Sequence, residues 1–238
     1  MRSEVSQIKE ALAPEGRLSF FQQVRKLFTD YWKGVVVGVM LQVWQQLCGI
    51  NTALYYGPNI IEDAGFGGGG SGVEHDREVL LYSLPLSGIN FVATIATLFV
   101  IDKLGRRYIM LRSLPFIAIF MWLLALSFGL IHMAEVSWAR WMALFSLCLY
   151  LAAFAIGMGS TPWTVNAEIY PLPLRATANA FATTANWLSN YAVTAVFLTA
   201  VGSPLGTVLT YAIIGCFAMA AWVFIYFLLP ETKGKSLP

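Results

Sequence analysis

Neutral amide side chains recur inside the long apolar runs of this chain, where polar groups are otherwise few. They are Gln45, Gln46, Asn51, Asn90, Asn186 and Asn190, and a tryptophan, Trp163, stands in a further apolar run. Each amide supplies both hydrogen-bond donors and acceptors, which matches a ligand made of hydroxyl groups. An indole adds a flat apolar face for the C–H surface of a sugar and one N–H donor. The pattern indicates a site for a polyhydroxylated ligand; the alternative is hydrogen bonding between helices, worth about 1 kcal/mol or less per contact.

The spacing of these residues limits how they can meet. Gln45 and Asn51 are six residues apart, so on an ideal helix they point about 120° apart. They converge on one ligand only if the site is wide or the helix unwinds between them. Gly49 stands in that interval, and glycine adopts the backbone conformations that interrupt a helix.

Charged residues form a second group, at the ends of the apolar runs. They are Asp102, Arg106 and Arg107 in the stretch DKLGRR, Glu168 and Arg175 around a proline-containing hairpin, and Glu231 in PETKGK. One interpretation is that they set the membrane topology and contact lipid headgroups. The other is a latch of carboxylate–guanidinium pairs that joins helix ends in one state and parts in another. The forked guanidinium of arginine suits such a latch.

The composition identifies the solvent that surrounds these elements. Of the 238 residues, 58% are hydrophobic and only 12% are charged, which is about half the charged share of a soluble domain. Long apolar runs with so few charges indicate a chain embedded in lipid. The net charge of +2 is too small to indicate a nucleic-acid partner. We see no acid/base or nucleophile constellation of an enzyme, and isolated cysteines and histidines predict no metal site, so no cofactor is expected.

Six apolar runs are long enough to cross a hydrocarbon layer, which takes about 20 residues. They span residues 34–61, 79–101, 109–132, 139–167, 177–201 and 206–229. Lysine and arginine favour cytoplasmic loops. Thirteen of them fall on the side that holds both ends of the chain, and two, Arg77 and Arg140, fall on the other. The sequence therefore predicts an all-α polytopic membrane protein with six transmembrane helices and both termini in the cytoplasm.

Two of the runs contain helix breakers in corresponding positions. Gly57 and Pro58 interrupt the first run, and the segment from Gly157 to Pro162 interrupts the fourth, 104 residues later from proline to proline. Broken helices in corresponding places of two three-helix units point to the binding site of a transporter. We therefore expect two three-helix repeats with a site at the breaks.

The expected domain organisation follows the runs. Residues 1–33 form a cytoplasmic linker with an amphipathic helix, which lies either at the protein surface or at the membrane face. Residues 34–229 form the transmembrane bundle, with a flexible extracellular loop at 62–78, and residues 230–238 form a cytoplasmic tail. The loop contains GGGGSG, a flexible composition that suits either a natural loop or an engineered insertion.

Several motifs, taken together, resemble those of a known family. QQLCGIN followed by YY, DKLGRR, PW with NAEIYPLPLR, NWLSN and PETKGK occur in the order of the sugar porter family of the major facilitator superfamily. The span from about residue 17 to 238 resembles the C-terminal six-helix half of that family, which is one half of a major facilitator fold. The branch it most resembles carries myo-inositol as well as hexoses. Cys48 departs from the small hydroxyl residue common in the first motif.

The resemblance implies a role for each matching residue. The residues implied to contact or line a sugar site are Gln45, Gln46, Asn51, Asn90, Trp163, Asn186, Trp187 and Phe154. Tyr55 and Tyr56 are implied to gate the site from outside. The residues implied to form a cytoplasmic latch are Asp102, Arg106, Arg107, Glu168, Arg175 and Glu231.

We therefore expect half of a transporter that moves a monosaccharide or polyol by alternating access across a membrane, the plasma membrane in particular. A second half would complete it: the family's N-terminal six helices, which this sequence does not contain, or another copy of this chain in a homodimer. The alternatives are a sugar-binding or sensing module and an isolated half-transporter with no transport of its own. The sequence leaves open hexose against myo-inositol, and proton symport against facilitated diffusion.

Overall fold

The structure is a computed structural model that describes residues 18–67 and 72–231. Most of the predicted linker (1–17), the centre of the glycine-rich segment (68–71) and most of the predicted tail (232–238) lie outside the described residues. All described elements are helical. They are α2 (Phe20–Asp30), α3 (Trp32–Leu47), α4 (Ile50–Tyr55), α5 (Gly57–Asp63), α6 (Val73–Leu104), α7 (Arg106–Ala134), α8 (Ala139–Phe154), η1 (Ala155–Gly159), α9 (Thr161–Glu168), α10 (Leu172–Ala200) and α11 (Pro204–Leu228).

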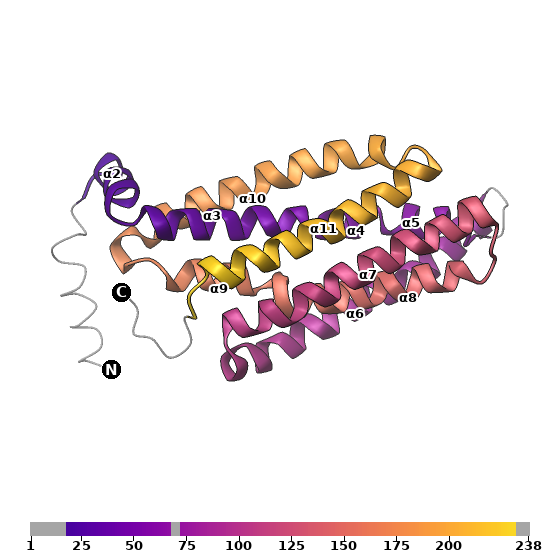
Figure 1. Cartoon of the computed structure of the whole chain (residues 1–238), viewed down its shortest axis with the longest axis horizontal. Helices are drawn as coiled ribbons and strands as arrows, with labels where there is room; N and C mark the ends of the chain where they lie inside the picture. Colours follow the sequence, from indigo (N-terminus) through magenta and orange to yellow (C-terminus); the bar gives the residue numbers. More distant parts are fainter. Residues whose placement is uncertain (1–17, 68–71, 232–238) are drawn as a thin grey trace.

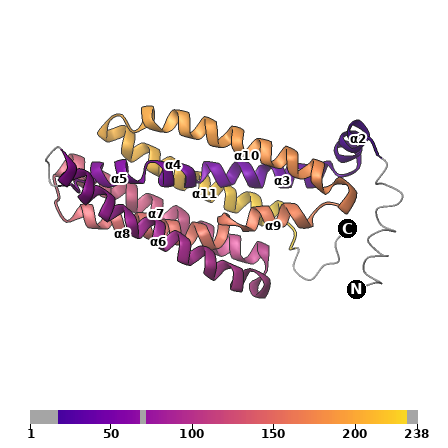
Figure 2. The same cartoon turned by 180° about the vertical axis from the view of Figure 1, so that it is seen from behind.

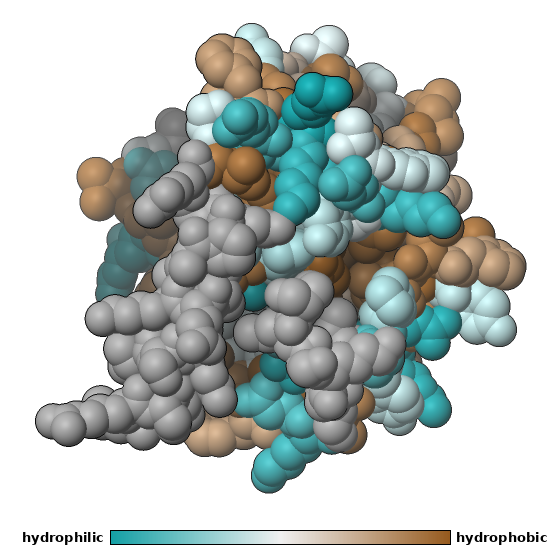
Figure 3. All heavy atoms as spheres, turned by 90° about the vertical axis from the view of Figure 1, so that its left-hand side faces the viewer, coloured by the Kyte–Doolittle hydropathy of each residue, from teal (hydrophilic) through white to brown (hydrophobic). Residues whose placement is uncertain are grey.

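The long helices run beside one another along the long axis of the molecule, and α2 lies across one end of them (Figure 1). The same end holds the α6–α7 turn, the hairpin between α9 and α10, and the C-terminal end of α11, as the view from behind also shows (Figure 2). Hydrophilic side chains gather on this end of the molecule (Figure 3). The charged motifs of the sequence therefore share one end of the bundle.

Four described helical segments are long and apolar enough to cross a membrane: α6, α7, the segment Ala139–Glu168, and α11 from Leu205. The other two predicted runs centre on α3 and α10. α3 ends after 16 residues, and α10 carries polar residues along its length, among them Arg175 and Asn186. Length and composition thus support four crossings, and the six-crossing topology stays a prediction. The predicted loop 62–78 is shorter than expected, because α6 already begins at Val73.

The first and fourth runs are both interrupted, and the two interruptions differ in kind. In the first, α3 ends at Leu47 and Gly49 adopts a left-handed φ of 84° before α4 begins. That conformation is unfavourable for residues with a Cβ atom, so glycine suits it. In the second, α8 passes into η1, a π-helix, before α9 begins with Pro162 in its first turn. A π-helix departs from the regular α-helical hydrogen-bond pattern and is often found at functional sites.

The helices α7 and α11 are continuous and are joined by two reciprocal hydrogen bonds. Trp122 of α7 donates its Nε1 hydrogen to the carbonyl of Ala212 at 3.1 Å, and Trp222 of α11 donates to the carbonyl of Leu111 at 3.0 Å. The helices approach closely at Gly215, where a Cβ atom would collide with the Trp122 ring. Most of the buried apolar residues of α7 belong to one large core cluster with residues of α11.

α2 begins with a capping box at Ser19, which explains why the helix starts there. The Gln22 side chain accepts a hydrogen bond from the Ser19 backbone N–H at 2.9 Å, and the Ser19 hydroxyl accepts from the Gln22 backbone. Leu27 is fully buried in a second cluster, with Tyr170 and Leu174 from the α9–α10 region. The sequence predicted an amphipathic helix here; its contact with a membrane stays a prediction.

Candidate functional site

A cavity of about 410 Å³ lies where the two interrupted helices meet α6 and α10. Its lining includes all eight residues that the sequence analysis assigned to a sugar site. They are Gln45, Gln46, Asn51, Asn90, Phe154, Trp163, Asn186 and Trp187, and the lining is completed by Ile50, Thr94, Ala155, Gly159 and Ser160. Trp163 is 40% exposed and Trp187 is 59% exposed, so this side of the cavity is open to the surroundings of the chain.

Gln45 is anchored to the backbone of the π-helix η1. Its Nε2 donates to the carbonyl oxygens of Met158 and Gly159 at 2.6 and 2.7 Å. A backbone carbonyl can only accept a hydrogen bond, so these two contacts fix which end of the Gln45 amide is the nitrogen. Gln45 Oε1 is then an acceptor, and Asn186 Nδ2 donates to it at 2.8 Å. The interruption of the fourth run therefore supplies acceptors that orient a side chain of the first.

The orientation of Gln45 determines which ends of the neighbouring amides are donors and which are acceptors. Asn186 Nδ2 also donates to Gln42 Oε1 at 2.7 Å, so Asn186 Oδ1 is the acceptor for Gln46 Nε2 at 3.0 Å. Gln46 Oε1 accepts in turn from Asn51 Nδ2 at 2.9 Å. We call Gln45, Asn186, Gln46 and Asn51 the amide network. It ends at Asn51 Oδ1, which accepts no hydrogen bond from the part of the chain that the structure describes.

The lining of the cavity suits an uncharged ligand with many hydroxyl groups. No charged side chain is among the described residues that line it. The free end of the amide network offers an acceptor at Asn51, and Asn90 and Thr94 add neutral polar groups from α6. Trp163 adds an aromatic surface. Such a set binds by hydrogen bonds and by contact with C–H groups, without ion pairing.

Some residues of the site were not singled out from the sequence. Gln42 is fully buried and holds Asn186 from behind the cavity. Thr94 lies one helical turn beyond Asn90. Both stand at helical spacing from predicted residues, so the same pattern of polar groups in apolar runs could have found them. The carbonyl groups of η1 carry no such signal, because every residue has a carbonyl.

The predicted outer gate, Tyr55 and Tyr56, lies apart from the described lining of the cavity. Tyr55 ends α4 and is 53% exposed. Tyr56 stacks on Phe197 of α10, with 5.3 Å between the ring centroids and nearly parallel planes. Both residues stand at the α4–α5 junction, away from the end of the bundle that carries α2 (Figure 1). Their gating role stays a prediction.

Arg106 is the centre of the predicted latch. Its Nη2 lies 2.9 Å from an oxygen of Asp102 and 2.8 Å from Glu168 Oε1, to which Nε also donates at 3.2 Å. Glu231 accepts a hydrogen bond from the Arg106 backbone N–H at 3.1 Å. Gly105 makes the tight turn before α7 with a φ of 97°, and a Cβ atom there would press on the Glu231 carboxylate. A carboxylate at the N-terminus of a helix is favoured by the helix dipole.

Arg107 and Arg175 make other contacts. Arg107 Nη2 donates to the carbonyl of Tyr226 at 2.8 Å, and its guanidinium lies 5.7 Å from the centroid of that ring. Arg175 Nη2 donates to the carbonyl of Tyr170 at 3.2 Å. Among the described residues, Arg106 is therefore the predicted latch arginine that pairs with carboxylates, and Arg107 and Arg175 bond to backbone carbonyls.

An all-helical bundle with membrane-crossing helices and an uncharged polar cavity between interrupted helices is characteristic of a membrane transporter. The family model for sugar (and other) transporters matches residues 1–238. The chain belongs to this family, and it is an integral, multi-pass membrane protein.

The chain spans about half the length of the curated relatives it matches. It is 29% identical to the probable inositol transporter 2 of Arabidopsis thaliana, over 86% of this chain and 48% of that protein. It is also 29% identical to facilitated glucose transporter member 2 of Rattus norvegicus, over 98% of this chain and 42% of that protein. Among solved structures, the proton:xylose symporter XylE of E. coli bound to 6-bromo-6-deoxy-D-glucose has a TM-score of 0.77 and 30% identity, over 99% of this chain and 47% of that one.

Proposed function

We propose that this chain is half of a transporter that moves a monosaccharide or polyol across a membrane by alternating access. The observation that carries the proposal is the uncharged cavity in which the amide network, Asn90 and Trp163 lie together. Sugar hydroxyls match amide donors and acceptors, and the C–H face of a sugar matches an indole. Relatives named for inositol and glucose, and a structure named for xylose, support the same class of substrate.

A second half completes the site in this proposal. The exposed sides of Trp163 and Trp187 leave the cavity open, whereas a small-molecule site normally encloses most of its ligand. The missing wall is an N-terminal six-helix half or another copy of this chain. Because halves of this type are related by an axis along the membrane normal, either arrangement is compatible with the fold.

We further propose that residues 34–229 cross the membrane six times, with residues 1–33 and 230–238 in the cytoplasm. The charged motifs and α2 share one end of the bundle (Figure 1), and thirteen of the fifteen lysine and arginine residues belong to that side by sequence. The positive-inside rule places that side in the cytoplasm. Arg106 and its carboxylates then form a cytoplasmic latch, which opens and closes as the transporter changes state.

The first experiment is to measure the oligomeric mass of the purified chain in detergent, together with uptake of labelled glucose and myo-inositol into liposomes. Uptake is measured with the chain alone and with an N-terminal half supplied separately. Saturable uptake of either compound in one of these arrangements is expected, and the arrangement identifies the second half. Failure of both arrangements to bind or take up either compound would contradict the proposal.

A matched pair of tryptophan variants tests the cavity itself. Trp163→Ala removes an indole from the lining, and Trp138→Ala removes an exposed indole that stands before α8, outside the described cavity lining. We expect Trp163→Ala to weaken sugar binding at least severalfold, and Trp138→Ala to leave it within about twofold of the original. Equal effects of the two variants would remove the cavity as the site.

A further inference from the structure

The short helix α9 carries residues of both functional regions. Trp163 lines the cavity, and Glu168, at the C-terminal end of α9, pairs with Arg106. The helix has only eight residues and stands between two interruptions, η1 on one side and the non-helical residues 169–171 on the other. A helix this short is held in place by its contacts with neighbouring helices rather than by its own hydrogen bonds.

Two side chains from this region reach the backbone of α3. Asn166 Nδ2 donates to the carbonyl of Gly38 at 3.1 Å, and the Tyr170 hydroxyl donates to the carbonyl of Gly34 at 3.0 Å. Asn166 is 2% exposed and Tyr170 is fully buried. Each carbonyl has two lone pairs, so it can accept such a bond in addition to its helical one. Burial raises the pKa of the Tyr170 hydroxyl still further above neutral pH, so the group remains a hydrogen-bond donor.

The two glycines of α3 make this contact possible. A Cβ atom at position 38 would collide with Asn166 Oδ1 and with the Tyr170 hydroxyl, and one at position 34 would touch the Tyr170 ring at 3.5 Å. The pair is spaced four residues apart, the small-xxx-small pattern that lets helices approach closely in a membrane. Here the glycine pair is contacted by two hydrogen-bonding side chains, Asn166 and Tyr170.

We propose that Asn166 and Tyr170 are positioning residues that hold α9 against α3 and so fix Trp163 with respect to the amide network. The inference rests on the proposed function, because it gives a role to residues of that site. It also has a mechanical consequence. The contacts with α3 are neutral and buried, whereas the pair of Arg106 and Glu168 lies at 13% and 21% side-chain exposure near the end of the bundle. When that ion pair opens, α9 stays with α3 and separates from the α6–α7 turn.

The test measures how often α9 opens away from the helices it packs on, with no sugar present. A cysteine replaces Val165, a fully buried residue of α9, in a Cys216→Ser background, because Cys216 is the exposed cysteine of the described chain. The rate of thiol labelling in liposomes, with the labelled site identified by mass spectrometry, reports the opening of α9. Tyr170→Phe keeps the ring and removes one hydrogen bond, so labelling should rise about fivefold. Tyr170→Phe combined with Asn166→Leu should raise it further.

Thr164→Val is the matched control, because the Thr164 hydroxyl bonds to Ser160 near the start of its own helix and not to α3. Its labelling rate should stay within about twofold of the parent. If the double variant labels no faster than this control, the inference is wrong. Should the double variant fail to fold, as judged by circular dichroism and gel filtration, the single Tyr170→Phe variant decides by the same criterion.

A second readout separates this inference from the proposed function. Tyr170→Phe should weaken binding of labelled glucose or myo-inositol severalfold, since Trp163 is less well positioned. Faster labelling without sugar binding by any form would keep the contact between α9 and α3 and contradict the transport proposal. Unchanged labelling with normal sugar uptake would contradict the role of the contact between α9 and α3 and leave the transport proposal standing.

Discussion

The α7–α11 pair and the two interrupted runs differ in how their backbone carbonyls are used. α7 and α11 are continuous, and each accepts an indole hydrogen bond from the other at a carbonyl that still belongs to a regular helix. The first and fourth runs are broken at Gly49 and at η1. The carbonyls of Met158 and Gly159 at the second break accept the bonds that orient Gln45. In α7 and α11 these carbonyls serve to join two helices. In the interrupted runs they orient a side chain that lines the cavity.

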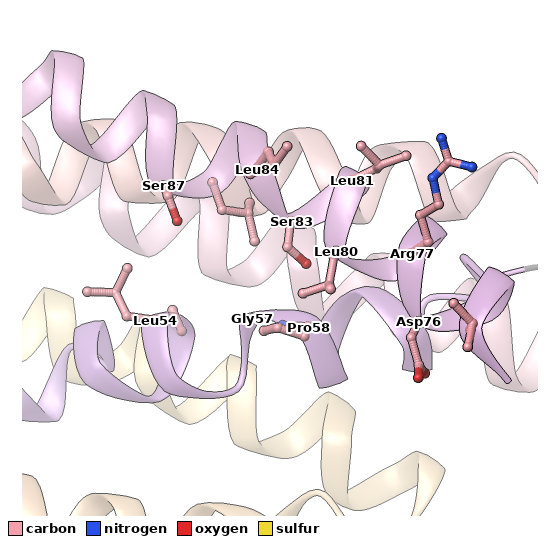
Figure 4. Close-up of a pocket in the computed structure, with 13 residues that line it drawn as sticks. Leu54, Gly57, Pro58, Asp76, Arg77, Leu80, Leu81, Ser83, Leu84 and Ser87 are labelled. Carbon is pink, nitrogen blue, oxygen red and sulfur yellow. The ribbon is translucent and has the colours of Figure 1, made fainter.

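A second, larger groove with a mostly apolar lining shows the same contrast. A groove of about 660 Å³ lies between the α4–α5 junction and the first turns of α6, with Leu54, Leu80 and Leu84 along it and Asp76 and Arg77 at one end (Figure 4). Leucine is the commonest residue of its lining, and it lacks the amides of the smaller cavity. The candidate site is therefore distinguished from this groove by its hydrogen-bonding groups and not by its size.

The most damaging change to the interrupted helices should be Gln45→Leu. It leaves the two η1 carbonyls without the Gln45 donor and removes one of the acceptors of the Asn186 amide, which keeps its bond to Gln42; a buried unsatisfied polar group costs about 1–3 kcal/mol. We expect the affinity for glucose or myo-inositol to fall about 100-fold, measured by equilibrium binding to the reconstituted protein. The helix content should not change. Affinity within twofold of the parent would show that the amide network does not orient the ligand.

A double variant in α7 and α11 tests the other side of the comparison. Trp122→Phe together with Trp222→Phe deletes both indole hydrogen bonds and keeps aromatic rings in place. The free energy of unfolding should fall by about 1–2 kcal/mol, seen as a lower midpoint in thermal unfolding in detergent. Sugar affinity should be unchanged. A large loss of affinity with little loss of stability would mean that the two regions are not separate.

A smaller effect is expected at the free end of the amide network. Asn51→Ala removes the last amide and leaves only Gln46 Oε1 without its donor, so affinity should fall about fivefold to tenfold. Thr184→Val is the control on α10, because that hydroxyl is exposed and bonds within its own helix. Isothermal titration of both variants gives the comparison. A loss at Asn51 as large as that at Gln45 would contradict a network anchored at one end.

A still smaller loss of affinity than at Asn51 should come from Glu168→Gln. It removes a charge from the pair with Arg106 but lies outside the described lining of the cavity. We expect the distribution of inward and outward states to shift, with intrinsic sugar affinity within about threefold of the parent. Spin-label distances across the cytoplasmic end of the completed transporter would measure the shift. Identical distance distributions would leave these charges as topology signals only.

Much of the lining of the candidate site could be predicted because polar residues are few in the apolar runs of a membrane protein. The eight predicted lining residues were found as amides, aromatics or motif members in apolar runs, and the cavity brings them together. Gly49 could be predicted as the point of unwinding from the angle between Gln45 and Asn51, and the helix is interrupted there. The all-helical architecture could be predicted from the low share of charged residues and the length of the apolar runs.

The features that could not be predicted involve backbone carbonyl groups and contacts between residues far apart in the sequence. The direction of the amide network is fixed by carbonyls of η1, which have no side-chain signature. Asn166 lies at the end of the predicted run 139–167, beside the proline-containing hairpin, and its place in the sequence does not show that it is buried against Gly38. The spacing of arginines and carboxylates predicted a shared latch, but only contacts in three dimensions separate Arg106 from Arg107.

The anchoring of Gln45 in main-chain carbonyls also bears on how selectivity could evolve. Substitutions exchange side chains, and the carbonyl oxygens of positions 158 and 159 persist whatever residue is placed there. A mutation at Gln45 disturbs the orientation of all the other amides in the network, whereas a mutation at Asn51 changes only the last amide. A laboratory selection for a new substrate should therefore accumulate its changes at Asn51, Asn90 and Thr94 and keep Gln45 unaltered.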